Sequence, residues 1–180
     1  MIRVTALLAE AGLIDRTWFS DEGATRGRYV HQACHYYDMG ELDEDSLDPV
    51  LIPYLEGWKK FTADTQVTIL RAEERIVNER LGITGTPDRV VEWPGVGYAV
   101  IDIKSGSLSD WTAIQLAAYK LLLTDAVKDD DWPRVLKRFA VNLPGDGTYK
   151  VKEYKDRADE GIFLAALSIH NWKKNHGGRG

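Results

Sequence analysis

Residues 85–90 read Gly-Thr-Pro-Asp-Arg-Val, and residues 100–106 read Val-Ile-Asp-Ile-Lys-Ser-Gly. Side chains alternate along a strand, so Asp102 and Lys104 point to the same face. Asp88 follows the tight Gly-Thr-Pro turn, and pairing of two neighbouring strands can bring it beside Asp102. Two carboxylates and an ammonium group at the edge of an apolar core are costly unless a hard cation neutralises the acids. The stretch therefore predicts a divalent metal site at a strand end.

Phosphodiester hydrolysis is the chemistry that needs such a set of side chains. Asp88, Asp102 and the main-chain carbonyl of Ile103 can hold Mg²⁺ or Mn²⁺ against the scissile phosphate. The ion polarises a phosphoryl oxygen and lowers the pKa of bound water. Lys104, a compact point charge, steadies the attacking hydroxide or the charge on the pentavalent phosphorus. Taken alone, Asp102 and Lys104 also fit an ordinary ion pair at a strand end.

The segments around this stretch predict a mixed α/β domain. Period-2 alternation and turn residues predict three consecutive strands in a meander, and the turn at 94–97 separates the last two. Helices precede the meander, and a helix, a hairpin and a last helix follow it. The expected helices cover 25–39, 48–61, 111–124 and 156–172, and the expected strands cover 67–77, 83–93, 98–103, 138–143 and 148–154.

Composition narrows the class of protein. With 180 residues, 44% hydrophobic and 28% charged, the chain predicts one globular domain over 1–180, with a core over 24–155 on which the N-terminal helices and the C-terminal helix pack. No apolar run approaches the ~18 residues of a membrane span, and the first residues lack the features of a secretory signal. We therefore expect a cytoplasmic protein without a membrane partner. A lone cysteine, Cys34, cannot supply an iron–sulfur cluster, and none is expected.

The net charge of -5 is unevenly distributed. Segment 38–48 carries six carboxylates and no base, and is interpreted as a solvated loop, while 125–131 carries four carboxylates and one lysine. Outside these two segments, bases exceed acids by four. A nucleic acid therefore remains a candidate partner through local basic patches.

Two further motifs complete a pattern that resembles a known family. Residues 26–31 read Arg-Gly-Arg-Tyr-Val-His, and residues 115–119 read Gln-Leu-Ala-Ala-Tyr. Together with 85–90 and 100–106, and in this order, they resemble the PD-(D/E)XK nuclease superfamily over about residues 24–124. Within it, they are similar to the RecB-type exonuclease branch, which includes phage and CRISPR-associated exonucleases. The resemblance implies a restriction-endonuclease-like fold, with a mixed central sheet flanked by helices.

Residue roles follow from this resemblance. It implies that Asp88 and Asp102 bind the metal, that His31 is a further ligand, and that Lys104 is the catalytic lysine. Gln115 and Tyr119 lie four residues apart on one helix face, and such residues support the lysine or contact the phosphate in the family. The absence of the cysteines of the iron–sulfur members agrees with an expectation of no cluster.

A glutamate of the first strand often joins the site in this family, and two neighbouring glutamates compete for the position here. Regular alternation over 67–77 places Glu74, rather than Glu73, on the apolar face, so Glu74 is preferred. Other interpretations stay open. Tyr119 can be a core residue, and His35 offers an alternative His-x3-His pair with His31.

The pattern predicts a Mg²⁺- or Mn²⁺-dependent DNA nuclease. By its similarity to the RecB-type branch, it predicts an exonuclease that acts on single- or double-stranded DNA ends. Recombination, repair or phage DNA processing, with a recombination partner protein or an oligomer, is the setting that the resemblance implies. The alternative from another class is a catalytically silent module that binds DNA or protein, and a further alternative is a structure-specific endonuclease. Trp93 and Trp111 are the candidates for base stacking, against the alternative that they pack in the core.

Overall fold

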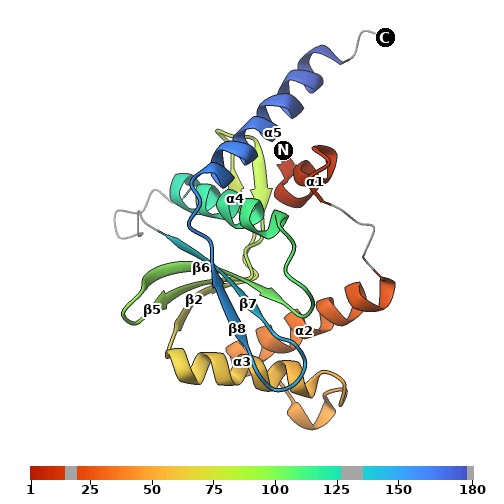
Figure 1. Ribbon diagram of the computed structural model, residues 1–180, viewed down its shortest axis with the longest axis vertical. Coiled ribbons are helices and arrows are strands. Elements are labelled where there is room, and N and C mark those ends of the chain that lie inside the picture. Colours follow the sequence, from red (N-terminus) through yellow and green to blue (C-terminus); the bar gives the residue numbers. More distant parts are fainter. Residues whose placement is uncertain (15–19, 127–135, 178–180) are drawn as a thin grey trace.

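The computed structural model describes residues 1–14, 20–126 and 136–177. Five helices, one short 3-10 helix and eight strands follow one another in these residues (Figure 1). In chain order they are β1 (Ile2–Arg3), α1 (Val4–Glu10), α2 (Asp21–Met39), η1 (Glu44–Ser46), α3 (Ile52–Thr65), β2 (Thr68–Ala72), β3 (Ile76–Asn78), β4 (Ile83–Gly85), β5 (Arg89–Trp93), β6 (Gly97–Lys104), α4 (Trp111–Ala126), β7 (Lys137–Asn142), β8 (Lys150–Glu153) and α5 (Ala158–His176).

A mixed five-stranded sheet, ordered β2-β5-β6-β7-β8, forms the centre of the molecule. Its only parallel pair is β6 with β7, and the other neighbouring strands run antiparallel. Strand β6 is central and buried on both faces, because every residue from Ala99 to Ile103 is less than a tenth exposed. Continuous burial explains why residues 99–101 of this strand are all apolar rather than alternating with polar ones.

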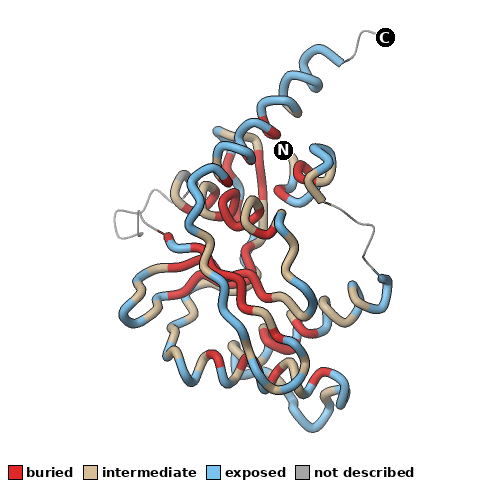
Figure 2. The backbone as a smooth tube through the Cα atoms, in the orientation of Figure 1, coloured by how far each residue is buried: buried red, intermediate tan, exposed pale blue. Residues whose placement is uncertain are grey.

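Helices cover both faces of this sheet, as the sequence predicts. Val100 packs in one apolar cluster with Leu116 of α4 and with residues of α1 and α5. Ile101 and Ile103 pack in a second cluster with Trp58 of α3 and with residues of α2. Figure 1 shows α4 on one side of the sheet and α2 and α3 on the other, and Figure 2 shows the buried backbone concentrated between them. The expectation of a restriction-endonuclease-like α/β fold is confirmed.

The predicted meander of three uninterrupted strands is wrong in one respect. Segment 67–77 divides into β2 and β3, segment 83–93 divides into β4 and β5, and β3 and β4 join β1 in a separate three-stranded sheet. The first division occurs at Glu73, whose φ of 54° is incompatible with an extended strand. The second occurs at Pro87, which lacks the N–H needed for a continuous ladder.

The helix boundaries also differ from those expected. Helix α2 begins at Asp21, where the Ser20 side chain accepts a hydrogen bond from the Gly23 N–H, and it ends at Gly40 in the left-handed region. Helix α5 continues to His176, beyond the expected end at 172. Most of the acidic segment 125–131 lies outside the described residues. Among the helices that the structure describes, none combines the length and apolar character of a membrane span.

Candidate metal and phosphodiesterase site

The candidate site forms where β5 begins and β6 ends. The antiparallel register places Arg89 opposite Ile101, so Asp88 lies beside Asp102. Both carboxylates are buried, at 8% and 2% exposure. The Ile103 N–H donates to Asp88 Oδ2 over 2.6 Å, which fixes the carboxylate at the end of the strand pair. The structure thus brings together the two aspartates that the sequence singles out.

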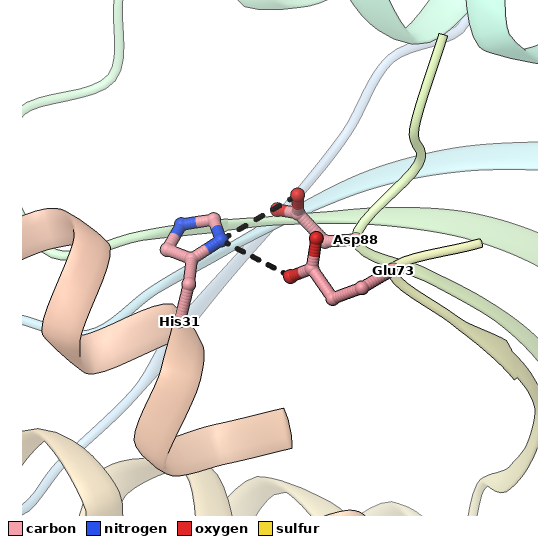
Figure 3. Close-up of side chains that lie close together, drawn as sticks. All are labelled: His31, Glu73 and Asp88. Atoms are coloured by element: carbon pink, nitrogen blue, oxygen red, sulfur yellow. Dashed lines mark ion pairs between the residues drawn. The ribbon is translucent and has the colours of Figure 1, made fainter. Parts of the chain in front are cut away.

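His31 reaches this strand end from α2. Its Nε2 lies 2.8 Å from the carbonyl oxygen of Ile103. Because a carbonyl oxygen only accepts hydrogen bonds, Nε2 carries the proton and Nδ1 faces the carboxylates. Nδ1 lies 3.5 Å from Asp88 Oδ1 and 3.6 Å from Glu73 Oε1. Figure 3 shows both carboxylates turned toward the imidazole.

Glu73, and not Glu74, lies at the site, so the preference for Glu74 is corrected. Glu74 forms an ion pair with Arg71 over 2.7 Å, and its side chain is 52% exposed. The prediction assumed regular alternation, but the left-handed backbone at Glu73 ends β2 and turns this side chain toward His31. The Glu73 N–H donates to the carbonyl oxygen of Asp88 over 3.1 Å, which ties the bend to the start of β5.

His31, Glu73 and Asp88 form a group that can hold a metal ion, with one ligand atom from each within 4.8 Å of the others. One imidazole and two carboxylates are a donor set suited to Mn²⁺ or Mg²⁺. Burial acts to lower the pKa of His31, but the charge and hydrogen bond of Asp88, with Glu73 and Asp102, outweigh it and raise that pKa to about 10. Two carboxylates beside one imidazole, with Asp102 next to Asp88, concentrate negative charge here, and the residues therefore fit a divalent cation.

Two predicted ligand atoms lie outside this three-residue group. The Ile103 carbonyl oxygen accepts the His31 hydrogen bond described above. The Asp102 carboxylate faces Lys104, whose Nζ lies 3.0 Å from Oδ1 and 2.8 Å from Oδ2. Only the Oδ1 contact has hydrogen-bond geometry, so the buried Oδ2 has a nearby charge but no donor. Direct metal binding by Asp102 and by Ile103 stays a prediction.

The charges of this cluster depend on one another. Burial, with a smaller contribution from Asp88, raises the pKa of Asp102 to about 6 although Lys104 opposes the rise. Burial also acts to raise the pKa of Asp88, but His31 and Lys104 outweigh it and hold that pKa below its usual range. For Lys104, the two aspartates outweigh burial and raise the pKa, so the ammonium stays charged at neutral pH.

Gln115 and Tyr119 lie together on α4, as their spacing predicts. Gln115 Nε2 donates to the Tyr119 hydroxyl over 3.1 Å, and both side chains are buried. Burial, reinforced by the charges of Asp88 and Asp102, raises the pKa of Tyr119. The phenol therefore lies within range of the negative charges of the two aspartates. Gln115 Oε1 is buried without a hydrogen-bond partner.

Arg89 is a supporting residue that the sequence reading missed. It is completely buried, and its Nε donates to Asp38 Oδ2 over 2.6 Å. Its Nη1 donates to the carbonyl oxygen of Asp88 over 2.6 Å and lies 3.5 Å from Glu73 Oε1. Asp38 was assigned to the solvated acidic segment, but it ends the buried face of α2, seven residues after His31. That helical spacing is the signal that could have identified it.

The two candidate stacking tryptophans have different surroundings. Trp93 contacts the rings of Phe61 and Phe139, with centroid distances of 5.4 Å and 4.8 Å, and packs half-buried against the second apolar cluster. Trp111 lies below Lys104, whose Nζ is 5.2 Å from the ring centroid. A cavity of about 760 Å³ extends from Lys104 and His31 past Trp111. The alternative pair of His31 with His35 receives no support among the described side chains, because the ligand group that they form contains neither His35 nor Cys34.

Comparison with known proteins places these residues within one family. A model of the PD-(D/E)XK nuclease superfamily matches residues 7–171. No curated protein matches the sequence. Among solved structures, the chain is similar to an alkaline exonuclease (LHK-Exo) from Laribacter hongkongensis, at 14% identity and a TM-score of 0.35 over 97% of this chain and 92% of that one. The complex of LHK-Exo with dAMP gives 15% identity and a TM-score of 0.35 over 98% and 93%.

Proposed function

Because this chain belongs to the PD-(D/E)XK nuclease superfamily, we propose that it is a divalent-metal-dependent DNA nuclease that acts as an exonuclease. The observation that carries the proposal is the convergence of His31, Glu73 and Asp88 with the Asp102–Lys104 pair at one strand end. The exonuclease mode rests on the order of the sequence motifs, which resembles that of the RecB-type branch.

His31 Nδ1, Glu73 and Asp88 would hold the ion, with Asp102 as the further ligand that the sequence predicts. When bound, a divalent ion polarises a phosphoryl oxygen and lowers the pKa of water. The His31 Nε2–H bond to Ile103 sets the tautomer that leaves Nδ1 available, as an outer hydrogen bond does for many ligating histidines. To hold the ion, His31 would have to lose its Nδ1 proton, because a proton and a metal ion occupy the same lone pair.

Lys104 is the group that we assign to the phosphate. Its ammonium is held by Asp102, yet its side chain is 21% exposed and borders the cavity. A positive charge fixed in advance at the place where negative charge develops stabilises the transition state without reorganisation. Asp102 thus orients the lysine, and Lys104 stabilises the charge on the pentavalent phosphorus.

The ligand set also favours one metal over the other. Mg²⁺ prefers oxygen donors and dehydrates reluctantly, whereas an imidazole suits a transition metal better. We therefore propose that Mn²⁺ supports cleavage at a lower concentration than Mg²⁺. A role in DNA recombination, repair or phage DNA processing, with a partner protein, is the proposed setting.

The test is cleavage of end-labelled linear DNA and closed circular DNA with Mn²⁺, Mg²⁺ or EDTA. We expect loss of the linear substrate alone, only with metal, and none with Lys104→Ala. The matched control is Lys60→Ala, which removes an exposed lysine of α3 and should leave the rate unchanged. Cleavage of the closed circle would indicate an endonuclease instead of an exonuclease. Metal binding without cleavage of either DNA would favour the silent binding module.

A further inference from the structure

Helix α5 contains two parts with different surroundings. Its buried residues, Asp159, Phe163, Ala166 and Leu167, all lie in the first half, which contacts α1 and α4. From Asn171 to Gly177 every described residue is exposed, and Figure 1 shows this end projecting away from the sheets. Isolated helical turns are marginal in water, so a projecting end normally gains its stability from packing.

A second apolar stripe runs along the exposed side of α5. We define the α5 stripe as Ala158, Ile162, Ala165, Ile169, Trp172 and His176, all of which are exposed. Their spacing alternates between four and three residues, which is the heptad spacing of a helix that packs against another helix. Ile162, Ile169 and Trp172 are 42%, 57% and 63% exposed. The stripe carries no acid and no lysine or arginine, so it can lose water at little electrostatic cost.

We infer that the α5 stripe pairs antiparallel with the α5 stripe of a second copy of this chain. In knobs-into-holes packing, a hole is made by residues i, i+3, i+4 and i+7 of the facing helix. Residues 158, 161, 162 and 165 make such a hole, and three of them are Ala, Gly and Ala. An antiparallel pair centred between Ala165 and Ile169 places Trp172 of each copy over this hole of the other.

This self-complementarity favours a second copy over an unrelated partner. The two-fold arrangement uses the same patch twice, and it places the largest side chain of the stripe against the smallest residues. A parallel pair would instead place Trp172 against Trp172 and leave the hole empty. An added Cβ at Gly161 would meet nothing within 4 Å in the single chain, so the space there is open.

The size of the stripe sets the strength of association. A helix of 19 residues is about 28 Å long. One helix face of this length covers on the order of a few hundred Å² per copy, below the ~800 Å² per partner that is standard for stable complexes. The dimer is therefore weak and depends on concentration in the micromolar range or above.

Sedimentation equilibrium of the full chain, from about 5 µM to about 500 µM, tests the inference. We expect the wild-type mass to rise from one chain towards two across this range. Gly161→Gln fills the hole and should keep the chain monomeric throughout, although glutamine favours the helix and should not lower the thermal stability of the single chain. Leu164→Gln changes an exposed residue outside the stripe and should behave like the wild type.

Chemical cross-linking tests the antiparallel geometry separately. A short bis-maleimide should link Ala165→Cys into a dimer, because this position lies next to the two-fold axis, and should not link Leu164→Cys. Cys34 is buried and does not compete for the reagent. A wild-type mass of one chain at every concentration, or a dimer that Gly161→Gln leaves intact, would overturn the inference.

Discussion

Arg89→Met tests the buried ion pair between Arg89 and Asp38, which lies next to the candidate site. Arg89 is 0% exposed, and the Asp38 side chain to which it donates is 3% exposed. The substitution preserves much of the volume but leaves the Asp38 carboxylate with one hydrogen-bond donor among the described residues, the Trp58 indole N–H at 2.8 Å. Removing one partner of a buried ion pair costs about 3–5 kcal/mol, because the remaining charge stays desolvated.

For a chain of 180 residues, each kcal/mol corresponds to about 2–4 °C, so we expect the Tm to fall by about 6–20 °C. Urea unfolding in EDTA measures the free energy directly, without stabilisation by metal. The double variant Asp38→Leu with Arg89→Met should lose less than the sum of the two single variants, since it leaves no unpaired charge. The exposed control Lys60→Met should unfold like the wild type. A loss below about 1 kcal/mol for Arg89→Met, or strict additivity in the double variant, would refute the reasoning.

Further predictions concern the site and the packing around it. Glu73→Gln should weaken Mn²⁺ binding in calorimetry at least about tenfold, whereas Glu74→Gln should leave it unchanged, because only Glu73 lies beside His31. The folded-state pKa of His31, about 10, lies above its ordinary 6.5, so its stabilising contribution in EDTA is fully present below pH 6.5 and is lost as pH rises through 10. The affinity for Mn²⁺ should rise over the same interval, by up to about tenfold per pH unit. Gly85→Ala should lower the free energy of unfolding by about 1–3 kcal/mol, because its Cβ would lie 2.7 Å from the Tyr119 ring.

Each of these predictions has a control within the chain. For the pH series, His31→Gln should lose the dependence between pH 7 and pH 10, and retention of the full dependence would assign it to another group. For the glycine substitution, Gly106→Ala meets nothing within 4 Å and should cost less than Gly85→Ala. Equal effects of Glu73→Gln and Glu74→Gln on metal binding would contradict the assignment of Glu73.

The relative positions of the motif residues could be predicted from the sequence, because they depend on residues that are close together in the chain. Strand alternation places Asp102 and Lys104 on one face, and helix periodicity places Gln115 beside Tyr119, so their proximity follows from covalent geometry. The four motifs, in this order, resemble the PD-(D/E)XK pattern, and that resemblance implied the superfamily and its mixed α/β fold with helices on both faces. The resemblance itself needs only the residues of each motif and the order of the motifs.

Tertiary structure decided the features that depend on irregular backbone and on distant pairs. Alternation favoured Glu74, but a single left-handed residue at position 73 ends the strand and brings Glu73 to His31. Composition placed Asp38 in a solvated segment, but Arg89, 51 residues away, buries it. The residues by themselves determined which chemistry this chain can carry. Only the folded chain decided which carboxylates surround His31, because the left-handed backbone at Glu73 and the pairing of β5 with β6 set their positions, and neither follows from a local pattern.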